Sequence, residues 1–318
     1  MISRRLIRIK LMQIIYGHFI KDEKDIEKTE KELLKSIQHA YDLYFLLFQL
    51  IIDVVHYYEE RILLAKQKKV PTYADLHPDT RLIDNRLIKQ LSKHRRIMDF
   101  KNSRIRWNEE NTLLRQLYQN ILNSKAYKTY MELPEPDYKD DKKIIIQIYE
   151  KEIAGCEVMF QLLEEADIYW NDDVEFVISM IIRTIRGMKE GDGEGEGEES
   201  NLMEIYKSDN DREYALKLLR KSILHYDEHK KIIDKYVKNW DVDRIAFIDT
   251  VIMEQALAEI LYFPTIPVKV SLNEYIELAK FYSTNKSGVF INGILDRIIE
   301  DLKKENRIIK QGEGLKEN

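Results

Sequence analysis

Apolar residues recur three or four positions apart along almost the whole chain, and no segment alternates apolar and polar residues over a useful length. This periodicity is typical of amphipathic helices. The composition agrees, because 318 residues include only 11 Gly and 6 Pro, whereas turn-rich β folds use more of both. We therefore predict an all-α fold, with enough length for one large domain or two of ordinary size.

The periodicity also predicts where the helices lie. We expect them at 2–20, 25–66, 80–100, 108–126, 140–166, 172–186, 211–238, 242–262, 272–282 and 288–304. Asn171 is the candidate N-cap of the helix that Gly187 closes. The stretch SLNE predicts a capping box, in which Ser271 and Glu274 exchange hydrogen bonds with each other's backbone NH groups.

An acidic segment, GMKEGDGEGEGEES at 187–200, separates the two groups of helices. Its glycines and glutamates cannot bury a core, so we expect a solvated linker. Asp192, Glu194 and Glu196 alternate like the first ligands of a calcium loop. The bidentate acid at the twelfth place of such a loop is missing, which favours the linker interpretation.

The single cysteine, Cys156, excludes an internal disulfide framework and fits a reducing compartment. The N-terminal stretch LIRIKLM keeps its charges and contains no clean apolar region of a signal peptide. The apolar run at 43–52 is far shorter than the roughly 20 residues that span a bilayer. These features predict a cytoplasmic protein.

The stretch HYDEH matches the H-x-x-E-H pattern of inverted zinc peptidases. On a helix, His225 and His229 could bind one metal, with Glu228 beside them as a base. The surrounding sequence is highly charged and supplies no third protein ligand. We favour two histidines without a metal, no cofactor and no catalysis, and keep a zinc hydrolase as the remote alternative.

The chain has a formal net charge of -5, yet its first ten residues carry four cations and no anion. On a helix, Arg4, Arg5 and Arg8 fall within an arc of about 100°. Such a tip can hold phosphates. Three arginines alone would equally fit a solvated helix start, where their charge opposes the helix dipole.

The C-terminal third resolves this choice by a series of motifs in order. Asp249 precedes the helix 251–260, Pro267 follows in a loop, and then come VSLNEYIELAK, Ser287 and FINGILD at 290–296. The first helix carries an aliphatic-Tyr pair that ends at Tyr16. In these features the chain resembles the family of the bacterial transcription antitermination factor NusB.

The resemblance covers about 1–20 and 211–303 and implies a NusB-like helical bundle. The family joins its first two core helices by a short connection, whereas here roughly 190 residues intervene. The expected organisation is a first core helix at 1–20, a helical insertion at 21–186, a linker and lead-in at 187–210, the rest of the core at 211–304 and a flexible tail at 305–318.

By resemblance, such a protein is non-catalytic and binds boxA-type single-stranded leader RNA. It does so with NusE, a small-subunit ribosomal protein, within an RNA polymerase antitermination complex that sustains ribosomal RNA transcription. The resemblance assigns RNA phosphates to Arg4, Arg5 and Arg8, and places Lys286 and Phe290 beside that tip. Tyr16 and Asp249 match positions of the partner face. The family is often acidic where this chain has Lys286, which could alter RNA preference.

Other readings remain open at the level of sequence. A pure protein scaffold would use the insertion to dock a different partner. The stretch 85–107 has eight Lys or Arg against the single acid Asp99 and includes Phe100 and Trp107, a composition that suits single-stranded RNA but equally a solvated face. NusB-like domains also occur fused to RNA cytosine methyltransferases, but no Gly-rich cofactor loop follows here.

Overall fold

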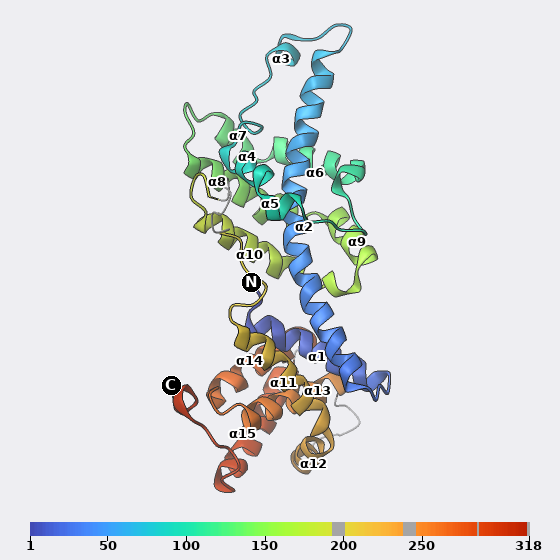
Figure 1. Cartoon of the computed structure of the whole chain (residues 1–318), viewed down its shortest axis with the longest axis vertical. Helices are drawn as coiled ribbons and strands as arrows, with labels where there is room; N and C mark the ends of the chain where they lie inside the picture. Colours follow the sequence, from blue (N-terminus) through green and yellow to red (C-terminus); the bar gives the residue numbers. More distant parts are fainter. Residues whose placement is uncertain (193–200, 238–245, 285, 317–318) are drawn as a thin grey trace. The chain divides into compact units, whose positions relative to one another are not determined.

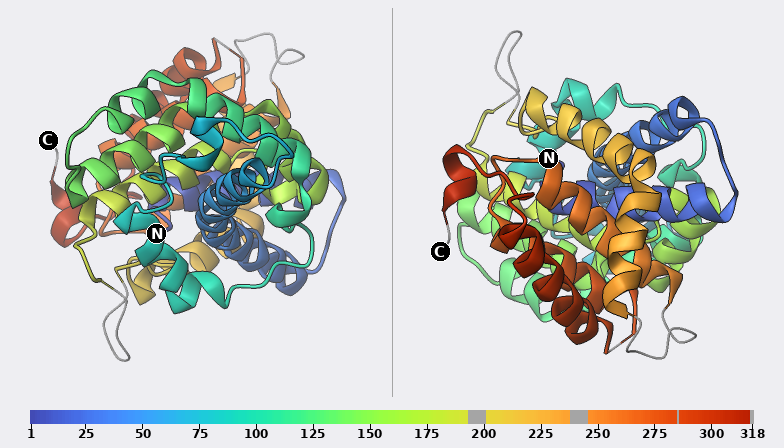
Figure 2. Two further views of the ribbon diagram at one scale, coloured as in Figure 1. Left: turned by 90° about the horizontal axis from the view of Figure 1, so that it is seen from above. Right: turned by 90° about the horizontal axis from the view of Figure 1, so that it is seen from below.

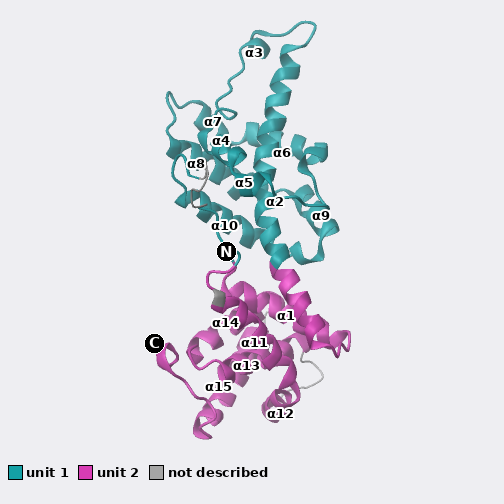
Figure 3. Cartoon of the chain, in the orientation of Figure 1, with its two compact units in different colours: residues 1, 38–205 teal, residues 2–37, 206–318 magenta. Residues whose placement is uncertain are grey.

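The computed structural model describes residues 1–192, 201–237, 246–284 and 286–316. Within these ranges the regular elements are all helical, and one isolated bridge joins Ile2 to Tyr206 (Figure 1). The predicted all-α class is therefore confirmed. The chain divides into two compact units: unit 1 contains Met1 and 38–205, and unit 2 contains 2–37 and 206–318 (Figure 3).

Unit 1 is assembled around the long helix α2 (Ile26–Lys66), which belongs to this unit from Gln38 onward. Figure 2 (left) shows the helix nearly end on, among the other helices of the unit. These are α3 (Tyr73–Leu76), α4 (Arg86–Lys93), α5 (Arg95–Met98), α6 (Asn111–Asn123), α7 (Lys125–Met131), α8 (Tyr138–Gln147), α9 (Glu157–Ala166) and α10 (Val174–Gly187). Short 3-10 turns lie at Trp107–Glu109 and Ile168–Trp170, and a π-helical segment lies at Ile148–Ile153.

Two large side chains of unit 1 hold α2 in place by donating hydrogen bonds to backbone carbonyl groups of that helix. The Trp107 indole NH donates to the carbonyl of Leu46 at 2.7 Å, and the Tyr149 hydroxyl donates to that of Leu47 at 2.9 Å. By length and composition α2 could cross a membrane, but 78% of its apolar window is buried inside the protein. Such burial is the pattern of a core helix in a folded unit.

Unit 2 contains α1 (Arg4–Ile20) and the start of α2, with five later helices. These are α11 (Asp209–Leu224), α12 (Tyr226–Val237), α13 (Phe247–Tyr262), α14 (Val268–Tyr282) and α15 (Ser287–Lys304). α13 is buried on nearly every side and contacts α1, α11, α12, α14 and α15. It is therefore the central helix of this unit.

Several predicted boundaries were wrong. The predicted helix 140–166 is interrupted by the π segment and by a break at Gly155, and the helix 211–238 is broken at His225. α10 begins at Val174 with Asp173, not Asn171, at its N-cap. α14 begins four residues earlier than expected because Pro267 takes the N-cap position.

The predicted capping box is also absent from α14. Ser271 lies within the helix, and its hydroxyl donates instead to the buried carboxylate of Glu259 at 2.6 Å. Glu274 points to Arg5 of α1. Ser271 and Glu274 therefore bond to charged side chains of α13 and α1, and not to the backbone NH groups that the SLNE pattern suggests.

The predicted flexible tail at 305–318 packs against unit 2 over its described part. The Gln311 NH donates to the carbonyl of Pro264 at 2.9 Å, and the ammonium of Lys310 donates to the carbonyls of Ile260 and Phe263 at 2.9 and 3.0 Å. Lys310 thereby caps the C-terminal end of α13, and its burial lowers its pKa to about 8. Gly314 is required in the tail, because a Cβ there would lie 1.9 Å from the carbonyl oxygen of Pro264.

Candidate nucleic-acid interface

The first turns of α1 carry the three arginines that the sequence singled out. Ser3 caps the helix by accepting a hydrogen bond from the NH of Leu6 at 3.3 Å. Each arginine then meets an acid from a different helix: Arg4 lies 3.0 Å from Asp211 of α11, Arg5 lies 3.1 Å from Glu274 of α14, and Arg8 lies 2.8 Å from Glu259 of α13. The three cations therefore connect α1 to the rest of unit 2.

Arg8 is buried in a network centred on the carboxylate of Glu259. Two guanidinium nitrogens of Arg8 donate to the two oxygens of Glu259 at 2.9 and 2.8 Å. The hydroxyls of Tyr214, Ser271 and Tyr275 donate to the same carboxylate. A bidentate pair with three further donors satisfies both charges away from water.

The protonation of this network follows from its contacts. Burial alone would lower the pKa of Arg8, but Tyr214 and Glu259 outweigh burial and hold that pKa above its ordinary value. Burial alone would raise the pKa of Glu259, but the hydrogen bond and charge of Arg8 lower it overall. Both groups are ionised at neutral pH. The expected phosphate contact of Arg8 is thus corrected, because its charge is already neutralised inside the unit.

Arg4 and Arg5 remain at the surface, with 43% and 54% of their side chains exposed. Arg4 donates through Nε to Oδ1 of Asp211. Its guanidinium also lies over the ring of Tyr214, 4.9 Å from the centroid. Two exposed arginines, each held in place by an acid, therefore lie at the tip of α1, and their exposure distinguishes them from Arg8.

The residues assigned to the partner face lie at the C-terminal end of α1 and the start of α13. Tyr16 is 37% exposed, and its ring packs against Phe247 with the centroids 5.4 Å apart. Asp249, one turn into α13, is buried and accepts a hydrogen bond from the Ser287 hydroxyl at 3.0 Å. Asp249 therefore fixes the start of α15, while Tyr16 is the one of the two that reaches the surface.

Lys286 and Phe290 lie at this same end. Lys286 is exposed and directly precedes Ser287, and Phe290 is half-buried in the first turn of α15. Along α13, Asp249 and Glu259 are ten residues apart, which corresponds to about 15 Å at the rise of an α-helix. Lys286 and Phe290 lie near the start of α13, whereas the arginine tip meets α13 near its end and α14 at its middle.

Two exposed apolar residues near Lys286 were missed at the level of sequence. Phe281, in the last turn of α14, is 79% exposed, and Val289 of α15 is 81% exposed. Both occupy positions where the apolar periodicity predicts nothing special. The sequence could have indicated an exposed Phe281, because it lies in the last turn of the helix, two residues after the buried Ala279. At that position the side chain does not lie on the buried face.

The histidines of HYDEH lie beside each other, with ring centroids 5.9 Å apart, but they differ in burial. His225 ends α11, and its ring stacks on Tyr262 with centroids 4.7 Å apart. His229 is fully buried, with Nδ1 2.9 Å from Oε1 of Glu254, and its burial lowers its pKa to about 4. Glu228 pairs with Arg307 at 2.8 Å. No group of three metal-ligating side chains occurs within the described residues.

The basic stretch 85–107 is absorbed by the folding of unit 1. Trp107 is buried, Phe100 stacks on Phe45, and Arg86 pairs with the buried Asp141 at 2.8 Å. Arg96 pairs with Glu204 at 2.7 Å. Trp107 is therefore committed to the core of unit 1, whereas Phe100 is half-buried and packs on Phe45.

Part of the acidic linker is held to the same unit. The side-chain amide of Gln90 donates to the carbonyls of Lys189 and Asp192 at 3.0 and 2.8 Å. Glu194 and Glu196, the other two acids of the calcium-like pattern, lie outside the described residues.

Comparison with known proteins adds independent evidence. The model of the NusB family matches residues 176–300, from within α10 to within α15. Proteins described as transcription antitermination protein NusB are similar to this chain. The one from Salinibacter ruber is 36% identical over 137 residues, which cover 42% of this chain and 86% of the relative.

Two further relatives carry the same description. The protein from Chloroherpeton thalassium is 40% identical over 104 residues (33% of this chain and 49% of the relative), and that from Methylacidiphilum infernorum is 44% identical over 91 residues (29% and 64%). No solved structure matches. The family model, the identity to the Salinibacter protein over most of its length and the motifs of α13 to α15 together show that this chain belongs to the NusB family.

Proposed function

We propose that this chain is a non-catalytic transcription antitermination factor that acts in the cytoplasm by binding boxA-type single-stranded leader RNA together with NusE. Membership of the NusB family carries the proposal. The surface arginines Arg4 and Arg5 support its RNA-binding part, because they are the cations of the tip that retain exposed donors.

The geometry of unit 2 suggests a path for the RNA. Phosphates would meet Arg4 and Arg5 at one end of α13, and Lys286 with Phe281 or Phe290 would meet the strand at the other. The two ends are separated by about 15 Å along the helix, a distance that one single strand can span. Exposed aromatic residues at the second end would stack on bases.

The proposed NusE face centres on Tyr16. Its ring is supported from behind by Phe247, so a partner would meet a rigid aromatic surface. Asp249 would act indirectly by holding Ser287 and the start of α15. We expect Tyr16→Ala to weaken the NusE complex while leaving the affinity for RNA alone unchanged, as measured by calorimetry of each binding step.

The test of the RNA proposal is a salt titration. Replacing Arg4 and Arg5 with Gln should flatten the slope of log affinity against log salt by about 1.4, since each phosphate neutralised on a single strand contributes about 0.7. Filter binding with boxA RNA measures this slope. The matched control replaces Lys230 and Lys231 of α12, two exposed lysines that remove the same charge from the same unit.

An aromatic substitution separates phosphate from base contacts. Phe281→Ala should lower affinity by about 1–3 kcal/mol without changing the salt slope, because stacking releases no counterions. Two outcomes of the salt titration would refute RNA binding at this tip. The arginine variant could keep both its affinity and its slope, or the control at Lys230 and Lys231 could change both equally. The scaffold interpretation would then take its place.

A further inference from the structure

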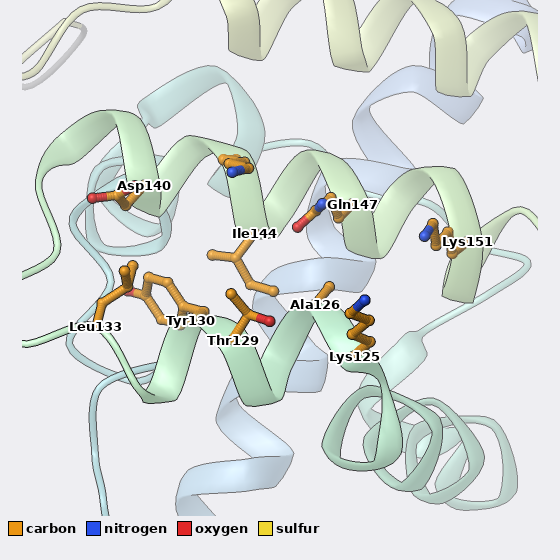
Figure 4. Close-up of a pocket in the computed structure, with 10 residues that line it drawn as sticks. Lys125, Ala126, Thr129, Tyr130, Leu133, Asp140, Ile144, Gln147 and Lys151 are labelled. Atoms are coloured by element: carbon orange, nitrogen blue, oxygen red, sulfur yellow. The ribbon is translucent and has the colours of Figure 1, made fainter.

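A cleft in unit 1 gathers cations that its folding does not use. The cleft has a volume of about 190 Å³ and lies between α7 on one side and α8 with the π segment on the other (Figure 4). Three lysines line it, one from each of these elements: Lys125, Lys143 and Lys151. Within the described residues, none of the three makes an ion pair or a hydrogen bond, unlike Arg86 and Arg96 of the same unit, which pair with acids.

The polar groups converge at one end of the cleft. Figure 4 shows the side chains of Lys125 and Lys151 at the same end, with Gln147 beside them. Thr129 lies toward the middle, next to the apolar floor that Ile144 provides. The hydroxyl of Thr129 and the amide of Gln147 also have no partner within the described residues, so both can donate to a ligand.

The acid that lines the cleft does not neutralise this end. Asp140 lies at the opposite end in Figure 4, and its carboxylate accepts a hydrogen bond from the NH of Asp137 at 3.1 Å. It is therefore engaged in the capping box that begins α8. Three ammonium groups and one carboxylate leave a net charge of about +2 across the lining residues at neutral pH.

The π segment explains why the cations share one face. The NH of Ala154 donates to the carbonyl of Tyr149, five residues earlier, at 3.1 Å. A turn of this kind holds more residues than an α-turn, so Lys151 stays above Gln147 and Lys143 instead of rotating away along the helix. Gly155 permits the exit from this turn, because a Cβ there would lie 2.9 Å from the carbonyl oxygen of Lys151.

The walls of the cleft are fixed from behind. The Tyr130 hydroxyl of α7 donates to the buried carboxylate of Asp141 in α8 at 2.6 Å. Arg81 donates to the carbonyls of Tyr130 and Met131 at 3.1 and 2.6 Å, which holds the end of α7. The backbone that carries the donors is thus held in place, while the lysine ammonium groups lie in solvent on their flexible stems.

We propose that this cleft binds the terminal phosphate of a phosphomonoester. A dianion of that kind matches the charge of the lining residues, and the ammonium, amide and hydroxyl groups supply the donors that its three oxygens require. The volume is below the roughly 300–1,000 Å³ of sites that enclose a whole small molecule. The cleft therefore holds the phosphate end of a ligand whose remainder lies outside. This inference does not depend on the proposed function.

The test uses methyl phosphate as the probe and dimethyl phosphate as the diester comparison, at constant ionic strength. Backbone amide NMR shifts of Thr129 and Gln147 should saturate with methyl phosphate. Dimethyl phosphate should bind about tenfold more weakly, because it carries one negative charge fewer. Equal binding of the two probes would overturn the monoester assignment in favour of a phosphodiester such as an RNA backbone.

The variants localise the site. Replacing Lys125 and Lys151 with Gln should weaken methyl phosphate binding by about tenfold or more, since two charge-assisted contacts are lost. Lys128→Gln is the matched control, because Lys128 is exposed on the same helix but does not line the cleft. The absence of saturable shifts in the unaltered chain, or an equal loss in the Lys128 variant, would refute the proposal.

Discussion

Glu254 and Glu259 lie five residues apart on α13 and are equally inaccessible to water, yet their pKa values shift in opposite directions. Glu259 receives hydrogen bonds from Arg8 and from three hydroxyl groups, and its pKa is lowered despite its burial. Glu254 faces the neutral imidazole of His229 at 2.9 Å, and its burial raises its pKa well above the ordinary value. Glu259 is a carboxylate at neutral pH, whereas burial favours the protonated form of Glu254.

Burial alone therefore does not determine the protonation of the carboxyl groups in this helix. Desolvation disfavours both carboxylates, and only a cation with several donors overcomes it. A protonated Glu254 can donate to Nδ1 of His229, so that the pair needs no counter-ion. One end of α13 is therefore stabilised by a buried charge network, and its middle by a neutral hydrogen bond.

The largest expected effect comes from removing the charge of the network. Glu259→Gln should lower the free energy of unfolding of unit 2 by about 3–5 kcal/mol, because it leaves the Arg8 guanidinium buried without a counter-charge. Urea unfolding at pH 7 measures this loss. The double change of Arg8→Met with Glu259→Leu should recover most of it, and a Glu259→Gln loss below about 1 kcal/mol would contradict the network.

A second prediction isolates the titration of His229. The folded pKa of His229 is about 4, below the unfolded value of about 6.5, so its contribution is complete above pH 6.5 and is lost as pH falls toward 4. Glu254, whose folded pKa is raised, acts in the opposite direction as pH rises above its unfolded value. Glu254→Gln removes that opposing contribution.

In the Glu254→Gln variant, stability should therefore fall by about 3 kcal/mol between pH 6.5 and pH 4, at ~1.4 kcal/mol per pKa unit. Unfolding curves at half-unit steps of pH measure the slope. The additional change of His229→Gln is the control and should flatten it. A pH profile identical in the single and double variants would show that His229 is not held neutral by burial.

A single hydroxyl of the network gives a smaller effect. Tyr214→Phe removes one donor to Glu259 while keeping the ring beneath Arg4. The expected loss is about 1.5–3 kcal/mol at pH 7, the range for a hydrogen bond to a charged group. The same hydroxyl deletion at Tyr44, which bonds to the neutral Thr184 in unit 1, should cost less. Equal losses at the two positions would argue that the charge of Glu259 adds nothing.

The smallest loss is expected at the neutral carboxyl. Glu254→Gln at pH 7 should lower the free energy of unfolding by no more than about 1 kcal/mol, because an amide can replace the donor to His229. The change removes no charge from the folded state and abolishes the cost of protonating Glu254 on folding, which shifts the balance toward a gain in stability. Compared directly with Glu259→Gln, this is the sharpest test of the two charge states. A loss as large as that of Glu259→Gln would mean that Glu254 is ionised.

The sequence determined the helical class and the order of the family motifs. These follow from local information: the period of apolar residues, the scarcity of glycine and proline, and short motifs in series. Asp249 and Ser287 both belong to the family motifs, and the structure joins them by a hydrogen bond that the motifs did not predict.

The tertiary structure alone decided which charges are available. Arg4, Arg5 and Arg8 share one arc of α1, but the acids that meet them come from α11, α14 and α13, more than 200 residues away. Helical periodicity contains no information on such partners. For the same reason the sequence could not place Lys286 at the opposite end from the arginines, show that Ser271 bonds to Glu259 instead of capping α14, or gather Lys125 and Lys151 at one cleft. Local spacing fixes the face of a helix, whereas the partner across that face depends on packing between distant segments.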